Sequence, residues 1–206
     1  MSTFYLDNSG TCTRVKLYGE DVRNLLLLNN WNEVNDHKNA EYIFINTCSF
    51  LQTKANYFLD KILQYSVFAE RNQKIVIIGC LGGVHYDDIK LISNDILIFT
   101  RDLNEIKEYF NFDKLPASKA TNVGEELNNK KALLNTFNKY VLKSKHIDFR
   151  LKRDKVCYLQ MSAGCLGKCS YCSEKFITKL HSRPISEIMA AIYDGIDRGF
   201  ELFSLS

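Results

Sequence analysis

Lys74-Ile75-Val76-Ile77-Ile78-Gly79-Cys80 is a short apolar run that ends in glycine and cysteine, and it predicts a buried strand over Lys74–Ile78. A second run of the same kind, Tyr42–Asn46, is followed by Thr47 and Cys48. On either side of these two runs, Thr3–Leu6 and Asp95–Phe99 also have strand character. The first half of the chain therefore contains four short candidate strands.

Amphipathic segments separate these strands. The clearest is Gln52–Ala69, where apolar residues recur at helical spacing, and further helices are expected at Glu20–Asn29, Tyr86–Ile92 and Leu103–Phe110. Alternation of strands and helices is typical of a parallel sheet covered by helices on both faces. We therefore predict a doubly wound α/β domain over residues 1–112.

The composition changes after this domain. Residues 113–155 are expected to be a basic linker, because the polar run from 125 leads into residues 130–155, which carry nine Lys/Arg against two Asp. Aromatic residues interleave with these charges, a pattern compatible with contact to RNA, although a solvated bridge between domains explains it as well. Residues 156–206 form a third block, with expected strands at Val156–Met161 and Glu201–Leu205 around a helix at Ile185–Arg198.

Composition limits the class of protein. With 206 residues, 46% hydrophobic and 25% charged, the chain is in the range of folded soluble proteins, which excludes a disordered or collagen-like chain. No apolar run approaches the roughly 20 residues of a membrane span, and the first residues lack a secretory signal, so we expect a cytoplasmic protein without a membrane partner. Seven cysteines in a reducing compartment favour metal or redox chemistry over disulfides.

The segment Cys165-Leu-Gly-Lys-Cys169-Ser-Tyr-Cys172 carries the strongest chemical signal. Three thiolates at this spacing on a loop can ligate three irons of one 4Fe-4S cluster. The fourth iron is then free to bind a small molecule. A three-cysteine zinc site or a chance group of thiols remains an alternative, with His181 as the available fourth zinc ligand.

A second group of cysteines is spread through the first domain. Cys48 and Cys80 each follow a predicted strand, and Cys12 comes a few residues after Thr3–Leu6. Because the carboxyl ends of parallel strands lie along one edge, these three thiols are expected to converge there and could hold a second cluster with an open iron. Buried cysteines that only pack at strand ends are the alternative. Cys157 lies within an apolar strand, where we expect it to pack in a core.

Both cysteine groups together resemble the radical S-adenosylmethionine methylthiotransferase family. The matching stretches are Ser9–Cys12, Ile45–Phe50, Ile78–Gly83, Ser162–Cys172 and Ser182–Pro184. The resemblance implies a flavodoxin-like N-terminal methylthiotransferase domain, followed by the first βαβ portion of a radical SAM partial (β/α) barrel. It also implies that the barrel is truncated, so that this chain alone is incomplete for turnover.

The resemblance assigns roles to the site residues. It implies that Cys165, Cys169 and Cys172 hold the 4Fe-4S cluster that binds S-adenosylmethionine and cleaves it to a 5′-deoxyadenosyl radical, with Tyr171 near the adenine. The resemblance also implies that Cys12, Cys48 and Cys80 hold an auxiliary 4Fe-4S cluster involved in sulfur transfer. A second S-adenosylmethionine would supply the methyl group, and the product would be a methylthioether.

The same resemblance implies a macromolecular substrate and an electron donor. Known members insert sulfur and a methyl group into an unactivated C–H of a tRNA adenosine or of an aspartate in a ribosomal protein, and they require an electron donor such as flavodoxin or ferredoxin. The chain differs from the usual sequence of this family at Thr11 and Val15, where members usually have Gly and Asn. The alternatives are a non-catalytic iron-sulfur or zinc module and a diverged radical SAM enzyme that acts on another peptide.

Overall fold

The structure is a computed structural model that describes residues 1–69, 72–116, 156–167, 169, 172, 174–177 and 180–205. The described residues belong to two compact units. The first unit comprises residues within 1–117 and 162–183, and the second comprises residues within 118–161 and 184–206. The segment that carries the C-x3-C-x2-C cysteines is thus grouped with the N-terminal domain, which the sequence did not predict. The expected boundaries at 112 and 155 remain a prediction.

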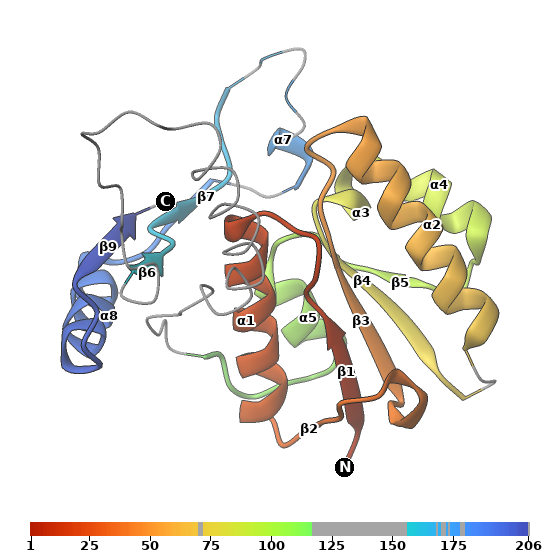
Figure 1. Cartoon of the computed structure of the whole chain (residues 1–206), viewed down its shortest axis with the longest axis horizontal. Coiled ribbons are helices and arrows are strands. Elements are labelled where there is room, and N and C mark those ends of the chain that lie inside the picture. The colour runs from red at the N-terminus through yellow and green to blue at the C-terminus, as the bar shows by residue number, and fades with distance from the viewer. Residues whose placement is uncertain are drawn as a thin grey trace, which may run out of the picture. The chain divides into compact units, whose positions relative to one another are not determined.

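The first unit is built on a five-stranded parallel sheet with the order β2-β1-β3-β4-β5 (Figure 1). Its strands are β1 (Thr3–Asp7), β2 (Asn32–Glu33), β3 (Tyr42–Thr47), β4 (Lys74–Gly79) and β5 (Leu97–Ile98). This strand order is that of flavodoxin-like folds. The predicted doubly wound, flavodoxin-like α/β domain is confirmed.

Helices cover both faces of this sheet. The main ones are α1 (Thr13–Leu28), α2 (Gln52–Phe68), α3 (Leu81–Val84), α4 (Tyr86–Ile92) and α5 (Leu103–Tyr109), with a short 3-10 turn at His37–Asn39. Side chains of α1 and α5 pack in one core with Phe4, Phe44 and Val76. Those of α2 and α4 pack in the other core with Ile43 and Ile77.

The two cores follow from the pleat of the central strands. Phe44 points into the α1 core, whereas Ile43 and Ile45 point into the α2 core, and all three are fully buried. Full burial of an apolar side chain of this size contributes about 1.5–3 kcal/mol. A strand with two buried faces is therefore a continuous apolar run in the sequence.

Helix α1 begins earlier than predicted. The sequence indicated a helix from Glu20, but α1 begins at Thr13 and has Cys12 at its N-cap position. Gly19 lies inside this helix, where glycine normally weakens a helix. A Cβ atom on Gly19 would lie 2.5 Å from Asn8 Oδ1 and 2.6 Å from Asn46 Nδ2, so close packing against the sheet requires glycine here.

The first unit also contains residues within 162–183, the segment that carries the C-x3-C-x2-C cysteines. A two-residue strand β7 (Ser162–Ala163) pairs antiparallel with β8 (His181–Ser182), and between them lies the single-turn helix α7 (Glu174–Ile177). The sequence predicted none of these three elements. They are too short to produce a periodic signal.

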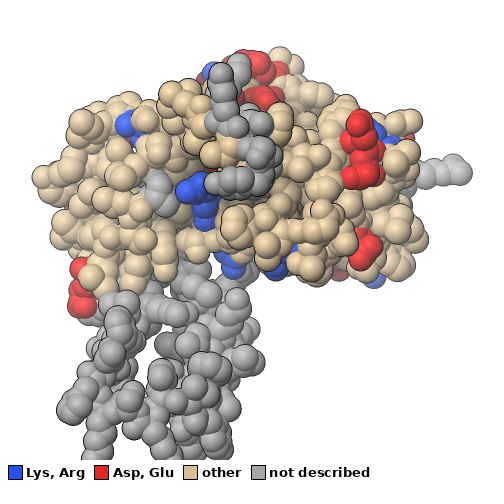
Figure 2. All heavy atoms as spheres, turned by 90° about the horizontal axis from the view of Figure 1, so that it is seen from above, with Lys and Arg blue, Asp and Glu red and all other residues tan. Residues whose placement is uncertain are grey.

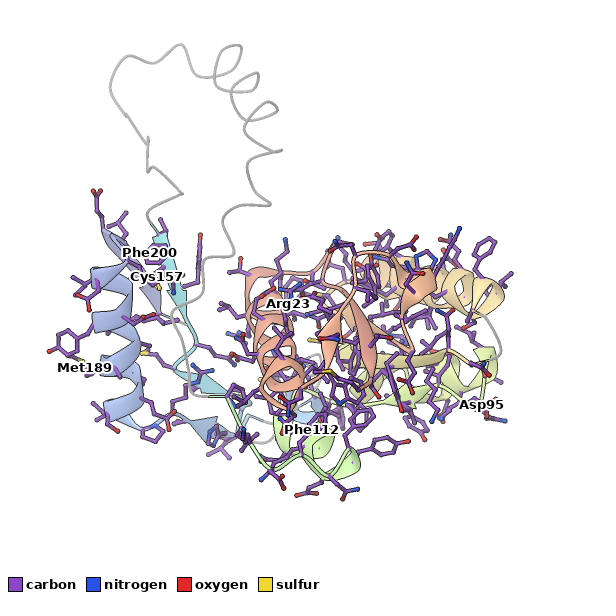
Figure 3. The ribbon with its side chains drawn as sticks, turned by 90° about the horizontal axis from the view of Figure 1, so that it is seen from below. Arg23, Asp95, Phe112, Cys157, Met189 and Phe200 are labelled. Atoms are coloured by element: carbon purple, nitrogen blue, oxygen red, sulfur yellow. The ribbon has the colours of Figure 1, made fainter. Side chains whose placement is uncertain are left out.

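The second unit holds the predicted βαβ arrangement. Strand β6 (Val156–Leu159) pairs in parallel with β9 (Leu202–Leu205), and helix α8 (Ile185–Asp197) packs against them. Cys157 is fully buried beside Phe200 and α8, which confirms its predicted packing role (Figure 3). That these elements begin a radical SAM barrel stays a prediction.

Gly79 closes β4 in a conformation that other residues rarely adopt. Its φ is +95°, and a Cβ atom there would lie 2.4 Å from the Thr47 carbonyl oxygen. That oxygen accepts a hydrogen bond from the Cys80 N–H at 3.0 Å. The glycine therefore allows the chain to turn tightly between β4 and Cys80.

We expect Gly79→Ala to destabilise the first unit more than Gly10→Ala does. Both glycines have positive φ, which costs an alanine about 1–2 kcal/mol. At Gly10 the nearest atom is a Tyr57 ring carbon at 3.2 Å, which can move, whereas Gly79 faces backbone. Overpacking should add about 1–3 kcal/mol at Gly79, measured by urea unfolding. Equal losses in the two variants would contradict this account.

Candidate functional site

Three cysteines lie at the carboxyl edge of the sheet. Cys48 directly follows β3 and Cys80 directly follows β4, while Cys12 precedes α1. The paired ends of the two strands, Thr47 beside Gly79, bring Cys48 and Cys80 to the same level of the sheet. Cys12 is exposed, and the other two are buried. This is the edge at which parallel α/β folds bind their ligands.

The Cys12 and Cys48 thiols are hydrogen-bonded to each other. The bond from Cys48 lowers the pKa of Cys12 to about 5, with help from the backbone N–H of Val15 and from the positive charge of Arg101. The same contact raises the pKa of Cys48, because the Cys48 thiol is the donor. Burial raises the pKa of Cys80 to about 11, and Cys12 adds to this shift through its charge. The three thiols therefore influence one another electrostatically.

A buried polar network fixes the start of α1 next to these thiols. The Asn46 side-chain amide donates to the Val15 carbonyl at 2.7 Å and to Asn8 Oδ1 at 2.6 Å. Asn8 in turn donates to the Lys16 carbonyl at 3.1 Å. Asn46 comes from β3, two residues before Cys48. The amide thus anchors the first turn of α1 and places Cys12 at the edge of the sheet.

The second cysteine group lies on the loop after β7. The Gly167 N–H donates to Cys165 Sγ at 3.2 Å, and the Cys172 N–H donates to the Cys169 carbonyl at 3.3 Å. A Cβ atom on Gly167 would lie 3.1 Å from Cys165 Sγ and 3.9 Å from Cys169 Sγ. Because Gly167 has no side chain, the space beside the Cys165 and Cys169 thiols stays open. Cys165 and Cys169 are exposed, and Cys172 is partly buried.

Among the residues that the structure describes, no three His, Cys, Asp or Glu side chains stand in a metal-coordinating arrangement. The chemistry of the residues nevertheless fits an iron-sulfur cluster, which binds thiolates. At the sheet edge, the Cys12 thiolate is stabilised by the Cys48 thiol, by backbone N–H groups at the start of α1 and by Arg101. On the loop, Gly167 leaves room beside Cys165 and Cys169.

Two features that the sequence analysis singled out lie outside the described residues. Tyr171, expected near the adenine of S-adenosylmethionine, is one of them, and the basic stretch 130–155 is the other. On the face shown in Figure 2, Lys/Arg and Asp/Glu side chains of the described residues form small separate groups of both signs. Within the described part of the chain, no helix has the length and hydrophobicity needed to span a membrane.

Three charged residues around the cysteines were not predicted from the sequence. Glu174, on α7, contacts Arg101 and lies 3.5 Å from Arg14. Arg101 follows β5 and so comes from the same strand edge as the cysteines. Arg101 was predictable from the sequence, because the residues that follow each parallel strand come to the same edge of the sheet. Nothing in the sequence pairs Glu174 with it across 73 residues.

A second ion pair joins α1 to the residues after the cysteine loop. Arg183 Nη2 donates to Asp21 Oδ2 at 3.1 Å. Burial raises the pKa of Asp21 to about 6, and the repulsion from Glu20 adds to this, although Arg183 opposes it. Asp21 thus has a cation beside it and still binds a proton more tightly than an exposed aspartate.

The N-terminal part of the chain is similar to a known protein family. Residues 4–99 match the uncharacterized protein family UPF0004. These residues contain β1 to β5 and all three cysteines of the sheet edge. The sheet and its cysteines are thus the part of the chain that is similar to UPF0004.

Over most of its length the chain is homologous to ribosomal protein uS12 methylthiotransferases named RimO. It is 29% identical over 177 residues to that of Helicobacter acinonychis, an alignment that covers 84% of this chain and 36% of the relative. The protein of Helicobacter pylori strain P12 is 28% identical over the same shares. That of Chlamydia pneumoniae is 25% identical over 86% of this chain and 35% of the relative. The chain thus spans about a third of the length of these relatives.

Asp21 gives the chain a specific dependence on pH. Because its pKa is raised from 3.8 to about 6 on folding, the folded state binds the proton more tightly. The resulting stabilisation is complete below pH 3.8 and disappears as pH rises through about 6. We therefore expect the unfolding free energy of the wild type, relative to Asp21→Asn, to fall by up to about 3 kcal/mol from pH 4 to pH 7.

Urea unfolding of the two proteins across this pH range provides the measurement. Asp60→Asn removes an exposed carboxylate from α2 and controls for the change in net charge. A wild-type curve that runs parallel to that of Asp21→Asn at every pH would show that Asp21 does not titrate in this way.

Proposed function

We propose that this chain carries the cluster-binding part of an iron-sulfur radical S-adenosylmethionine methylthiotransferase. The proposal rests on the convergence of Cys12, Cys48 and Cys80 at one edge of a UPF0004 domain. The C-x3-C-x2-C loop belongs to the same compact unit. The relatives named as methylthiotransferases align over most of the chain, which supports the same activity.

Each cysteine group has a separate role in this proposal. Cys12, Cys48 and Cys80 would hold one 4Fe-4S cluster, and Cys165, Cys169 and Cys172 would hold the other. When bound, the clusters and S-adenosylmethionine supply the electron, the sulfur and the methyl group that convert an unactivated C–H into a methylthioether. Tyr171 would contact the adenine. A zinc site and a non-catalytic iron-sulfur module are the outcomes that would replace this proposal.

The residues of the chain prepare the first of these sites. Arg101 and the backbone N–H groups of Arg14 and Val15 stabilise negative charge on Cys12. Burial of Cys80 keeps water away from one side of the thiols. Asn46 holds the first turn of α1 in place, so that Cys12 remains beside Cys48. These residues therefore favour a bound anionic cluster over three free thiols.

The substrate we propose is an aspartate of a ribosomal protein. The relatives are named for ribosomal protein uS12, and this supports a protein substrate over the tRNA adenosine that the basic stretch 130–155 suggested. An electron donor of the flavodoxin or ferredoxin kind would supply the electron. We place the protein in the cytoplasm, where cysteines remain reduced.

We expect about eight irons per chain after anaerobic reconstitution with iron and sulfide, as two 4Fe-4S clusters require. Cys48→Ala and Cys169→Ala should each reduce this to about four, because each removes a ligand of one cluster only. Cys157→Ala is the matched control, since Cys157 is buried like Cys48 but lies in β6. Iron and sulfide analysis gives the readout. If Cys169→Ala loses no iron, the two-cluster proposal is wrong.

Addition of S-adenosylmethionine should change the EPR spectrum of the reduced, reconstituted chain. The change should persist in Cys48→Ala and disappear in Cys169→Ala, because only the loop cluster is proposed to bind the molecule at an open iron. S-adenosylhomocysteine, which lacks the sulfonium charge, serves as the comparison ligand. A spectrum that S-adenosylmethionine leaves unchanged would favour a non-catalytic iron-sulfur module.

A further inference from the structure

Glu174 forms an ionic bridge between the cysteine loop and the sheet edge. It lies two residues after Cys172, and its carboxylate accepts a hydrogen bond from Arg101 Nη2. The same carboxylate lies 3.5 Å from Arg14 Nη1, which belongs to the first turn of α1. The Arg101 side chain is only 3% exposed, whereas that of Arg14 is 46% exposed. The bridge therefore has one buried partner and one that is open to water.

Apolar and backbone contacts reinforce this bridge. Ile177, at the end of α7, is 2% exposed and packs against Val15 and Cys80. The backbone N–H of Arg101 donates to the Ile177 carbonyl at 3.3 Å. Helix α7 thus contacts the sheet edge through both of its ends.

Gly83 permits the close approach of α7. A Cβ atom on Gly83 would lie 2.5 Å from the Phe176 carbonyl oxygen and 3.1 Å from its carbonyl carbon. Both atoms are backbone and cannot rotate away. The α3 turn that follows Cys80 is therefore shaped to receive the segment that follows Cys172.

Arg101 is itself held rigidly. The Tyr18 hydroxyl, from α1, donates to the Thr100 carbonyl at 2.8 Å. The Thr100 N–H and hydroxyl both donate to the Glu105 carboxylate at 2.8 Å. The chain on the N-terminal side of Arg101 is thus fixed by contacts from α1 and α5, so the guanidinium has a defined position from which to receive Glu174.

We propose that Glu174 is a positioning residue that, through Arg101, fixes the separation between the two cysteine groups. This inference rests on the proposed function, because a fixed separation matters where sulfur held at one group must reach a carbon activated at the other. An ordinary surface ion pair would contribute little and would tolerate loss of its charge. Loss of Glu174 leaves the buried Arg101 without this carboxylate, which should release α7 from the edge.

Hydrogen exchange of the metal-free, full-length chain tests the bridge without any cofactor. In Glu174→Gln, which keeps the shape and removes the charge, we expect the Arg101 amide, which donates to the Ile177 carbonyl, to exchange at least about tenfold faster. Amides of β3 and β4 should keep the wild-type rate and show that the fold is intact. Glu187→Gln, an exposed acid in α8, is the control. Unchanged exchange of the Arg101 amide in Glu174→Gln would overturn the proposal.

Arg14→Gln provides a second variant that removes only the exposed partner. Because Arg101 still holds the carboxylate, we expect a smaller acceleration at the Arg101 amide than in Glu174→Gln. An equal or larger acceleration would show that the buried pair is not the one that fixes α7.

Spin relaxation in the reconstituted chain tests the consequence for the two clusters. Relaxation of one cluster by the other falls steeply with separation, so Glu174→Gln should weaken it while iron and sulfide content stay at the wild-type level. Unaltered relaxation at full iron content would overturn the positioning role. If the wild type binds no iron, the proposed function fails, and the hydrogen-exchange result still decides whether the bridge holds α7.

Discussion

The parallel pairing of β3 with β4 determines where the cysteines of the sheet edge come together. The two strands pair from Tyr42 beside Lys74 to Thr47 beside Gly79. Both are buried on two faces, so a shift of register by one residue would move every side chain into the opposite core. The pairing therefore fixes Cys48 and Cys80 as neighbours at the carboxyl edge. The position of Cys12 depends on the same strands, because Asn46 of β3 anchors α1.

Electrostatics at this edge favour negative charge. The first turn of α1 presents backbone N–H groups to Cys12, and Arg101 adds a nearly buried positive charge. Burial of Cys80 opposes ionisation of its own thiol. In the free chain Cys12 thus favours the thiolate, whereas Cys48 and Cys80 favour the protonated thiol and would ionise only beside a compensating positive charge such as that of a metal.

Residues within 162–183 pack against the domain that matches UPF0004 but lie outside the match. The match ends at residue 99, just before Arg101, and Glu174 lies far beyond it. The family match therefore covers the sheet and its cysteines, whereas the ionic bridge joins residues on either side of the basic stretch. Asp21 and Arg183 form a second connection between the same two segments. The two ion pairs of Glu174, the Asp21–Arg183 pair and the Ile177 contact together explain why residues within 162–183 group with the N-terminal domain.

Local sequence patterns were sufficient to predict the doubly wound sheet, because an apolar strand with two buried faces leaves a run such as Lys74–Ile78. The strand-end rule also placed Cys48 and Cys80 together, since it needs only the strand direction. Only the folded chain shows that α1 begins at Thr13, because Gly19 is required by contacts with Asn8 and Asn46. The pairing of Glu174 with Arg101 likewise emerges only on folding. Such contacts join residues far apart in the chain, and no local pattern encodes them.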